Sequence, residues 1–162
     1  MSEARRAKVL TVSDGVTDGT REDRSGPALA DRLELAGWEV VDRRVVPDGV
    51  ESVALALREM CAGFSALVVT TGVTGFGPRD LSPEGTRTAI EREAPGLAES
   101  IRRAADGGER HFGMLGRGVC GTRGEALVCN LPGSTGGALE GLEIVLAVAD
   151  HVVDLMTGGR PH

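Results

Sequence analysis

The chain has 162 residues, of which 41% are hydrophobic, and a formal net charge of −6. These values fit one domain of ordinary size over residues 1–162. Aromatic residues are scarce, which excludes an aromatic stacking platform for single-stranded nucleic acid, and the acidic balance argues against duplex binding. No apolar run reaches the length of a membrane span, so no membrane association is expected.

Lysine and cysteine usage restricts the chemistry further. All basic residues except Lys8 are arginine, and Lys8 begins the first apolar segment, so neither a P-loop lysine nor a Schiff-base lysine has a candidate. The three cysteines (Cys61, Cys120 and Cys129) are odd in number and lack CxxC spacing. The N-terminus lacks the apolar core of a signal peptide. We therefore predict a reduced, cytoplasmic protein.

Hydrophobic periodicity and turn residues predict nine elements in the order βαβαβααβα. The predicted strands are 7–13, 38–46, 65–71 and 125–130. The third is the clearest buried strand, and the second is less buried than the first. Helices are expected from Ser25 or Gly26 to Gly37, from Asp48 to about Ala62, from an N-cap at Ser82 to about 94, from 95 to about 105, and over the C-terminal stripe that ends near Met156. Residues 15–24 are expected to form a polar loop, and residues 107–124 follow no clear pattern.

This order is typical of the α/β class, with a mostly parallel sheet sandwiched between helices. Ligands of open α/β sheets bind beyond the carboxyl ends of the strands. The sequence places polar groups at four such ends: Ser13 and Asp14, Pro47 and Asp48, residues 70–75, and residues 130–134. We therefore predict the functional site at this edge.

Two glycine-rich segments are candidates for binding loops. Residues 116–121 (GRGVCG) match GxGxxG, but no helix is expected after them, so we reject a dinucleotide fingerprint. Residues 70–80 (TTGVTGFGPRD) follow the clearest strand and precede a well-signalled helix. Glycines allow backbone amides to approach a phosphate or planar ring, so we favour a functional loop here over a plain connection.

Three carboxylates, Asp14, Asp48 and Asp80, lie just beyond strand ends or within this loop. Such an arrangement is suited to holding a hard divalent cation against phosphates. For Asp48 the alternative of a simple helix cap is equally favoured, whereas Ser82 suits the cap role better than Asp80. The histidines (His111, His151 and His162) lack metal-ligand spacing.

Five ordered blocks of the sequence resemble the molybdopterin adenylyltransferase family, the group of MogA, MoaB and the gephyrin G domain. The blocks are TVSDGVTDGTREDRSG, VVPD, TTGVTGFGPRDLSPEGT, REAPGLAESIR and NLPGS, and the resemblance runs from about Lys8 to Asp154. It implies a three-layer α/β/α sandwich of the molybdenum cofactor biosynthesis type. It also implies a homotrimer that contacts the molybdate-insertion enzyme.

The resemblance further implies Mg²⁺-dependent transfer of AMP from ATP to molybdopterin, with release of pyrophosphate. Asp48 and Asp80 would be the catalytic acids and the metal ligands. The resemblance implies substrate contacts in the TGxTG and NLPGS loops, at Thr71, Gly72, Thr74, Gly75, Pro132, Gly133 and Ser134, with Ser13 and Asp14 nearby. We further expect Arg79 and backbone amides to bind the phosphate oxygens of the substrate. Two alternatives stay open, a noncatalytic molybdopterin-binding homologue and a nucleotide pyrophosphatase of the same fold.

Two positions depart from the family pattern. Val73 stands where TGGTG is usual, and a β-branched residue disfavours positive φ, so a left-handed conformation there would be strained. Gly116 replaces the serine of the usual SRxxxG block.

Overall fold

A six-stranded sheet forms the centre of the fold, with the strand order β2-β1-β3-β6-β5-β4. The computed structural model describes residues 5–105 and 111–159. Within them the elements are β1 (Arg6–Val12), α1 (Asp14–Asp18), α2 (Ser25–Leu35), β2 (Glu39–Val46), α3 (Val50–Cys61), β3 (Leu67–Thr71), α4 (Ser82–Ala89), β4 (Arg92–Glu93), α5 (Pro95–Ala105), the 3₁₀ helix η1 (Phe112–Leu115), β5 (Cys120–Arg123), β6 (Ala126–Leu131) and α6 (Thr135–Met156).

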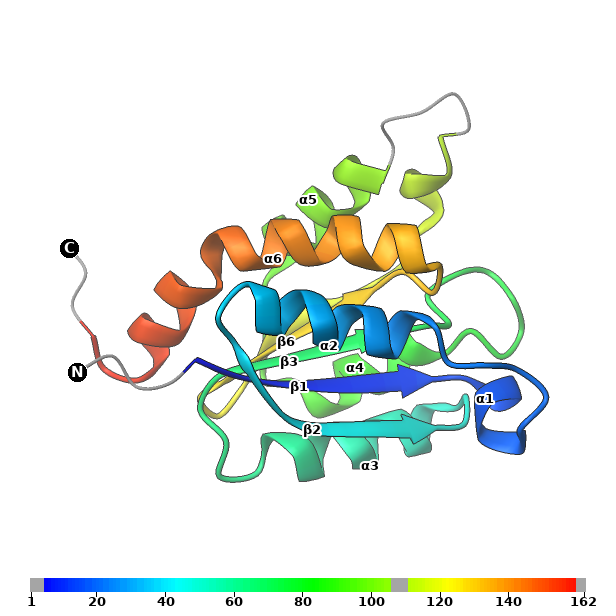
Figure 1. Cartoon of the computed structure of the whole chain (residues 1–162), viewed down its shortest axis with the longest axis horizontal. Helices are drawn as coiled ribbons and strands as arrows, with labels where there is room; N and C mark the ends of the chain where they lie inside the picture. Colours follow the sequence, from blue (N-terminus) through cyan, green and yellow to red (C-terminus); the bar gives the residue numbers. More distant parts are fainter. Residues whose placement is uncertain (1–4, 106–110, 160–162) are drawn as a thin grey trace.

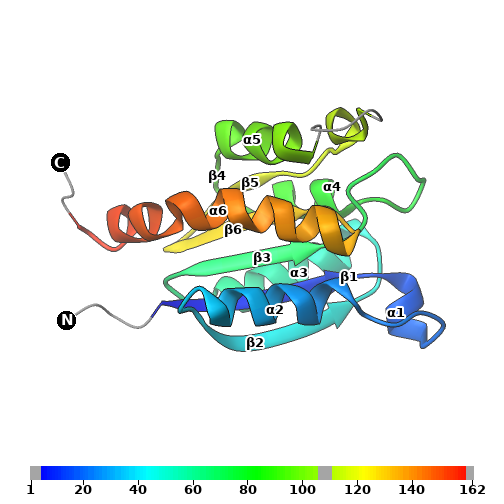
Figure 2. The same ribbon diagram turned by 45° about the horizontal axis from the view of Figure 1, so that its top comes forward.

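Helices cover both faces of the sheet (Figures 1 and 2). One face carries α2, α5 and α6, and the other carries α3 and α4. This arrangement confirms the predicted α/β/α sandwich. In the part of the chain that the structure describes, no helix combines the length and the apolarity needed to cross a membrane.

The four predicted strands are the parallel ones. β1 pairs in parallel with β2 and β3, and β3 pairs in parallel with β6. Two short strands, β4 and β5, extend the β6 side in antiparallel pairing and were not predicted. β4 has only two residues, both exposed, and the segment before β5 is rich in glycine, so neither shows an alternating pattern.

Burial along the strands follows the sequence pattern. Every residue of β3 and β6 is buried, whereas β2 alternates between exposed and half-buried residues. β2 is an edge strand, which explains why charged residues interrupt it. The core is aliphatic, and Leu10, Leu67, Leu127 and Leu142 are fully buried within it.

The helix starts differ from the predicted caps. α3 begins at Val50 with Gly49 as its N-cap, and no side chain caps it, so the reading of Asp48 as a helix cap is wrong. Ser82 is the first residue of α4 rather than its N-cap. The loop expected from residue 15 instead begins with the one-turn helix α1, which Ser13 caps through its Oγ. Because the Asp48 carboxylate does not cap α3, it is available for a functional site.

All three cysteines are buried and free of disulfide bonds. Burial raises the pKa of the Cys61 thiol to about 11. Because the thiolate is the reactive form, this thiol is chemically inert near neutral pH. Cys61 is part of the hydrophobic core.

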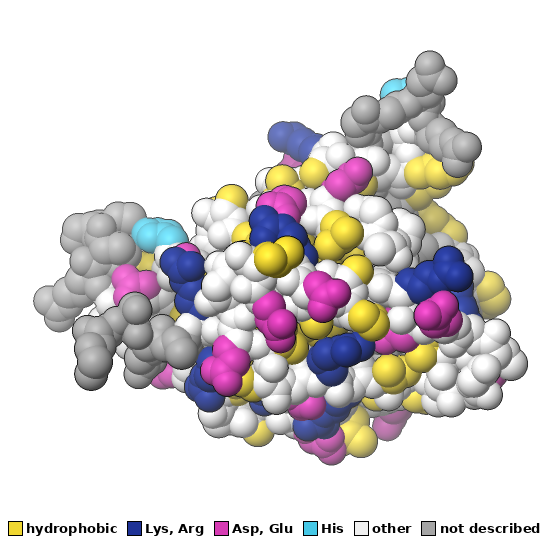
Figure 3. All heavy atoms as spheres, in the orientation of Figure 1, with side chains coloured by type: hydrophobic (Ala, Val, Ile, Leu, Met, Phe, Trp, Pro, Cys, Tyr) yellow, Lys and Arg dark blue, Asp and Glu magenta, His cyan; other side chains and the backbone are white. Residues whose placement is uncertain are grey.

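Figure 3 shows acidic and basic side chains interspersed over the face that carries α2 and α6. Several form ion pairs between elements. Arg32 on α2 places Nε 2.5 Å from Oε1 of Glu143 on α6, and Arg5 places Nε 2.8 Å from Oδ1 of Asp150. Such exposed pairs contribute at most ~1 kcal/mol each.

A buried polar network connects the two central strands, β3 and β6, to α4 and to Val119, the residue before β5. The Asn130 side-chain amide donates to Thr70 Oγ1 (2.9 Å) and Thr86 Oγ1 (2.8 Å), and its oxygen accepts from Val119 N (3.0 Å). Asn130 is 2% exposed, and both threonines are fully buried. The network therefore has no access to water as a substitute partner.

We expect Asn130→Ala to lower the free energy of unfolding by ~2–4 kcal/mol, because it leaves one amide and two hydroxyls buried without their partner. Urea denaturation measures this. The control is Thr157→Ala, which removes an exposed hydroxyl bonded to Val153 O (2.8 Å) and should cost under ~0.5 kcal/mol. Equal losses in the two variants would show that the network contributes nothing beyond an ordinary hydrogen bond.

Candidate functional site

The polar groups predicted at the strand ends lie on one edge of the sheet. In Figure 1, α1 follows the arrowhead of β1 on the side where β2 also ends, and the 72–81 segment follows β3 to the same side. Parallel pairing of β1 with β2 and β3 requires this, since the strands run in one direction. The structure thus brings together Asp14, Asp48 and Asp80, which follow β1, β2 and β3 respectively.

Asp14, Asp48 and Arg79 form a compact charged cluster at this edge. Arg79 Nε donates to Asp14 Oδ2 (2.6 Å), and its Nη2 donates to Asp14 Oδ1 (3.1 Å) and to Asp48 O (2.9 Å). Asp14 Oδ1 also accepts from Asp48 N (3.1 Å). The Arg79 hydrogen bonds lower the pKa of Asp14. Asp14 is therefore an ionised carboxylate that holds Arg79 and the Asp48 backbone in place.

The Asp48 carboxylate is the unusual group of the cluster. Its Oδ1 is buried and has no hydrogen-bond partner among the described residues. Burial raises the pKa of Asp48 to about 6, and the charge of Asp14, a side-chain hydrogen bond with Asp14 and the charge of Asp80 add to the shift, although Arg79 opposes it. Burying one carboxylate oxygen without a hydrogen-bond partner is costly. The arrangement is that of a group placed to receive a cation.

Asp80 is held by the loop that carries it. Its Oδ2 accepts from Gly77 N (2.8 Å), and its own N–H donates to Gly77 O (3.0 Å). A side chain on Gly77 would place a Cβ 2.9 Å from Asp80 Oδ2, so the carboxylate packs closely against the glycine. The loop therefore fixes the direction of the Asp80 side chain.

A polar cleft of about 810 Å³ opens beside this cluster. Its walls come from the end of β1, the 20–25 segment, the 71–75 segment and the start of α6. It is lined by eight of the predicted site residues: Ser13, Thr71, Gly72, Thr74, Gly75, Asp80, Gly133 and Ser134. Asp14, Asp48, Arg79 and Pro132 are outside its lining. Asp80 thus belongs to the cleft and also acts electrostatically on Asp48.

A second cavity, of about 560 Å³, adjoins the cleft and is mainly apolar. Its lining comes from α5, η1 and the 130–137 segment, and it includes Pro132. Thr74, Gly75 and Ser134 line both cavities. The site therefore offers two adjoining compartments of different chemistry, joined at these three residues.

Three of the predicted hydroxyls already have partners in the fold. Ser13 Oγ accepts from Val16 N (3.1 Å), and Ser134 Oγ accepts from Gly137 N (3.2 Å), so both cap helices that begin at the cleft. Thr71 Oγ1, fully buried, donates to Pro132 O (2.8 Å). These residues shape the cleft rather than present a free hydroxyl.

Two glycines allow the loops to approach one another. A Cβ on Gly72 would lie 2.2 Å from the backbone oxygen of Val12, and Gly72 has φ +108°. A Cβ on Gly133 would lie 3.3 Å from Gly72 Cα. The backbones at the ends of β1, β3 and β6 therefore approach one another with no side chain between them, which narrows the base of the cleft.

Val73 adopts the left-handed backbone conformation, with φ 50°. This is the conformation that we expected to be strained for a β-branched residue. The Val73 side chain packs on the edge of the core, and its carbonyl accepts from Ser82 N (3.3 Å). A β-branched residue in this region costs ~1–3 kcal/mol. The surrounding loop imposes the conformation that a glycine would adopt freely.

We expect Val73→Gly to change the free energy of unfolding by less than ~1 kcal/mol. Relief of strain offsets the greater flexibility of glycine and the lost packing. Val69→Gly, in fully buried β3, is the matched control and should cost at least ~3 kcal/mol. Urea denaturation of both variants tests this, and equal losses would mean that packing at Val73 outweighs the strain.

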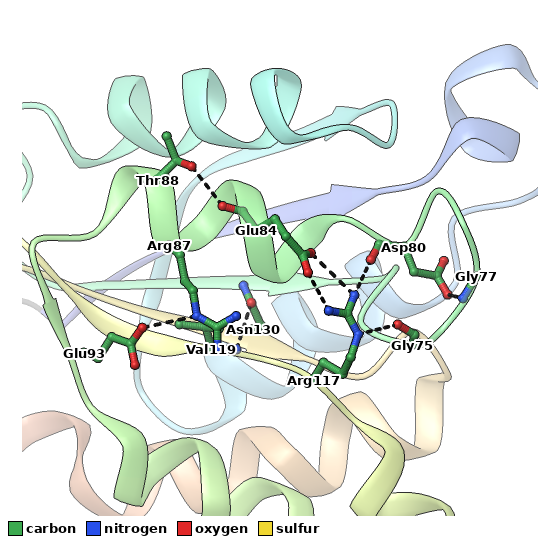
Figure 4. A network of polar contacts seen from close by, with 10 residues as sticks. All are labelled: Gly75, Gly77, Asp80, Glu84, Arg87, Thr88, Glu93, Arg117, Val119 and Asn130. Atoms are coloured by element: carbon green, nitrogen blue, oxygen red, sulfur yellow. Dashed lines mark hydrogen bonds and ion pairs between the residues drawn. The ribbon is translucent and has the colours of Figure 1, made fainter.

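Two further residues shape the site and were not predicted. Asp23 Oδ2 accepts from Thr11 Oγ1 (2.9 Å), and its Oδ1 accepts from Gly26 N (3.0 Å), so it binds the cleft wall to β1 and α2. Arg117 lies against the 74–80 loop (Figure 4). The spacing of Asp23 three residues before Gly26 was a usable signal for a cap. Nothing in the local sequence indicated the partners of Arg117.

The GxGxxG match at 116–121 ends within β5, and β6 rather than a helix follows, which confirms its rejection as a dinucleotide fingerprint. Residues 107–110, which belong to the segment without a clear pattern, and His162 lie outside the described residues.

Residues 8–151 match the family described as "Probable molybdopterin binding domain". The chain is similar to the molybdopterin adenylyltransferase of Helicobacter pylori, with 33% identity over 93% of this chain and 86% of the relative. A relative of the same name from Pyrococcus furiosus is 34% identical over 90% and 87%. The chain spans only 22–49% of the length of three longer relatives: the Drosophila melanogaster protein cinnamon, a Chlorobaculum tepidum bifunctional protein and Dictyostelium discoideum gephyrin.

Solved structures agree. The molybdopterin biosynthesis enzyme MoaB of Thermus thermophilus superposes with a TM-score of 0.86 at 41% identity, covering 95% of this chain and 97% of the other. The Mog protein of Mycobacterium ulcerans has a TM-score of 0.87 at 37% identity, covering 94% and 99%. On the family match, the sequence identity and the shared fold, this chain belongs to the molybdopterin adenylyltransferase family.

Proposed function

We propose that this domain acts in molybdenum cofactor biosynthesis and transfers an adenylyl group from ATP to molybdopterin. The observation that carries the proposal is the buried, unpartnered Asp48 Oδ1 in an acidic cluster that adjoins the polar cleft. The names of the relatives that the chain covers almost completely support the same reaction.

The two compartments suit a reaction with two substrates. The polar cleft is suited to phosphate groups, because α2 and α6 both begin at it and helix N-termini favour anions. The apolar cavity is suited to a planar ring. Their junction at Thr74, Gly75 and Ser134 is where the reacting groups would meet.

In the proposed step, an oxygen of the molybdopterin terminal phosphate attacks the α-phosphorus of ATP. A new P–O bond forms to the α-phosphorus, and the bond from that phosphorus to the bridging α,β-oxygen breaks. Pyrophosphate leaves with the electron pair, and the products are adenylylated molybdopterin and pyrophosphate. The protein's task is to orient the two phosphates and to stabilise the charge that develops.

The donor set fits Mg²⁺. Asp48 and Asp80 would hold the ion, since Asp14 is engaged by Arg79. Within the described residues no group of three His, Cys, Asp or Glu side chains is arranged for a metal, and Mg²⁺ commonly binds one or two carboxylates together with substrate phosphates. When bound, Mg²⁺ would neutralise charge on the phosphates and on the departing pyrophosphate.

Lys8, the one lysine of the sequence, does not supply positive charge to the phosphates. The Nζ of Lys8 donates to Met60 O (2.9 Å) and lies 4.2 Å from the ring centre of Phe64, among residues that line neither cavity. Arg79 is bound to Asp14 and orients the cluster. Arg21 and Arg24 line the polar cleft, and together with helix N-termini and backbone amides they can face the phosphates.

The direct test is to incubate the protein with molybdopterin, ATP and Mg²⁺ and to measure adenylylated molybdopterin and pyrophosphate. Formation of both in equal amounts, strongly reduced in Asp80→Asn, supports the proposal. Calorimetric binding of molybdopterin with no product would indicate a noncatalytic binding protein. Release of AMP from dinucleotides without molybdopterin would indicate a pyrophosphatase. Either result contradicts the adenylyl transfer.

We also propose that the chain forms a homotrimer in the cytoplasm and contacts the molybdate-insertion enzyme, as the resemblance implies. Exposed apolar side chains on η1, Phe112 and Met114 among them, offer surface for such association. Sedimentation velocity should give the mass of three chains, and a monomeric mass would contradict the trimer.

A further inference from the structure

The guanidinium of Arg117 connects both ends of the loop that carries Asp80 (Figure 4). Its Nε donates to Gly75 O (2.8 Å), and its Nη2 donates to Asp80 O (2.6 Å). The Arg117 backbone N–H donates to Thr74 O (2.9 Å). One residue from a distant segment thus holds the start and the end of the 75–80 loop.

The charge of Arg117 is matched by Glu84 in the first turn of α4. Nη1 donates to Oε1 (2.5 Å), and the two side chains are 30% and 36% exposed. The Arg117 hydrogen bond lowers the pKa of Glu84, so the carboxylate stays ionised near neutral pH. With its charge paired and its N–H groups directed at carbonyls, Arg117 serves the loop rather than an incoming anion.

Besides Arg117, the side chain of Arg79 attaches the loop to the fold, through hydrogen bonds to Asp14 and to the Asp48 carbonyl. The internal bonds of the loop join Gly77 to Asp80 in both directions, and Phe76, Gly77, Pro78 and Arg79 are exposed. These bonds shape the turn but do not attach it to the sheet, whereas Arg117 attaches it to the segment that leads into β5. Arg79 holds the exposed turn to Asp48, and Arg117 holds the two ends of the loop, so the position of the Asp80 carboxylate depends on Arg117 as well as on Arg79.

We infer that Arg117 is a positioning residue that sets the place of Asp80 in the site. The inference rests on the proposed function for its effect on catalysis, but the positioning itself concerns the free protein. Lysine cannot replace arginine here, because only the planar fork reaches two carbonyls and a carboxylate at fixed angles. A displacement of about 1 Å at a reacting group can cost ~10²-fold in rate.

The test uses Arg117→Lys with Arg123→Lys as the matched control. Arg123 is on β5 and donates to a single carbonyl, Ala89 O (2.8 Å), outside the loop. In Arg117→Lys we expect kcat to fall ~10- to 100-fold with KM for molybdopterin changed less than threefold, and the Mg²⁺ concentration for half-maximal rate to rise. Arg123→Lys should stay within twofold of the unmodified protein.

Hydrogen exchange supplies the readout that does not depend on activity. In Arg117→Lys the amides of Gly77 and Asp80 should exchange at least tenfold faster, while core amides of β3 keep their rates. Unchanged exchange at the loop overturns the inference whatever the assay shows. Should the unmodified protein make no product, the proposed function fails, and the exchange comparison still decides the role of Arg117.

Glu84→Gln separates the carbonyl bonds from the ion pair and serves if Arg117→Lys does not fold. Glu84→Gln keeps the Arg117 contacts to Gly75 and Asp80. Its loss of kcat and its increase in the hydrogen-exchange rate of the loop amides should therefore be several-fold smaller than those of Arg117→Lys. Equal effects in the two variants would mean that the charge pair, rather than the bonds to the loop, positions Asp80, and the inference would be wrong.

Discussion

Replacing Asp48 with Asn should reduce adenylyl transfer by at least ~10²-fold while making the free protein more stable. The activity falls because the substitution removes the unpartnered carboxylate that is placed to receive the cation. The stability rises at pH 7.5 because a half-buried charge, with one oxygen buried and unpartnered, is replaced by a neutral amide. A steady-state assay and urea denaturation of the same samples measure the two effects.

Asp42→Asn is the matched control. Asp42 is on β2 and accepts from Arg44 Nε (2.9 Å), so it is a carboxylate with its partner in place. We expect no loss of activity and a slightly lower stability. If Asp48→Asn lowers the free energy of unfolding as Asp42→Asn does, the Asp48 carboxylate is satisfied in the free protein and the argument for a cation site there fails.

The same carboxylate predicts a pH dependence. The native pKa of about 6 lies above the ordinary value of 3.8. Between these pH values native Asp48 keeps a proton that the unfolded chain has lost, so its contribution to stability is complete below pH 3.8 and declines as pH rises to about 6. Allowing for screening by solvent, this contribution is on the order of 1 kcal/mol.

Urea denaturation at pH 4.5 and pH 7.5 should therefore show a smaller difference between the unmodified protein and Asp48→Asn at the lower pH. Comparing the two proteins cancels the opposite contribution of Glu84, whose pKa is lowered by Arg117. Activity should also decline below about pH 6, as Asp48 takes up a proton. An equal stability difference at both pH values would contradict the raised pKa.

Replacing Gly72 with Ala should cost more than ~3 kcal/mol of unfolding free energy and deform the cleft. The new Cβ would lie 2.2 Å from Val12 O, a backbone atom of β1 that cannot yield without displacing the strand, and φ is +108°. Because Gly72 and Gly133 meet on the cleft floor, adenylyl transfer should be lost even at temperatures where the variant is folded.

Gly19→Ala separates the two causes. Gly19 also has a positive φ, +82°, but nothing lies within 4 Å of its added Cβ. Its cost should be only ~1 kcal/mol, from the left-handed backbone alone. Thermal denaturation of both variants gives the comparison, and similar melting temperatures would show that the close approach of β1 and β3 is relaxed in solution.

Local pattern was sufficient for much of this fold. The parallel strands and the long helices follow from apolar runs and turn residues, which act over a few neighbouring residues. The failures have equally local reasons. β4 and β5 are too short and too polar to show periodicity, and α1 is a single turn. Asp48 has the spacing of a helix cap, but its carboxylate does not cap α3.

The sequence by itself determined the sheet edge that carries the site, the loops that reach it and the acids Asp14, Asp48 and Asp80, because strand direction and residue order decide these. Only the tertiary structure decided which groups pair: Arg79 with Asp14, and Arg117 with the Asp80 loop and Glu84. Such partners are separated by 33 to 65 residues. Their hydrogen bonds depend on positions within about 3 Å, which packing sets and no local pattern encodes.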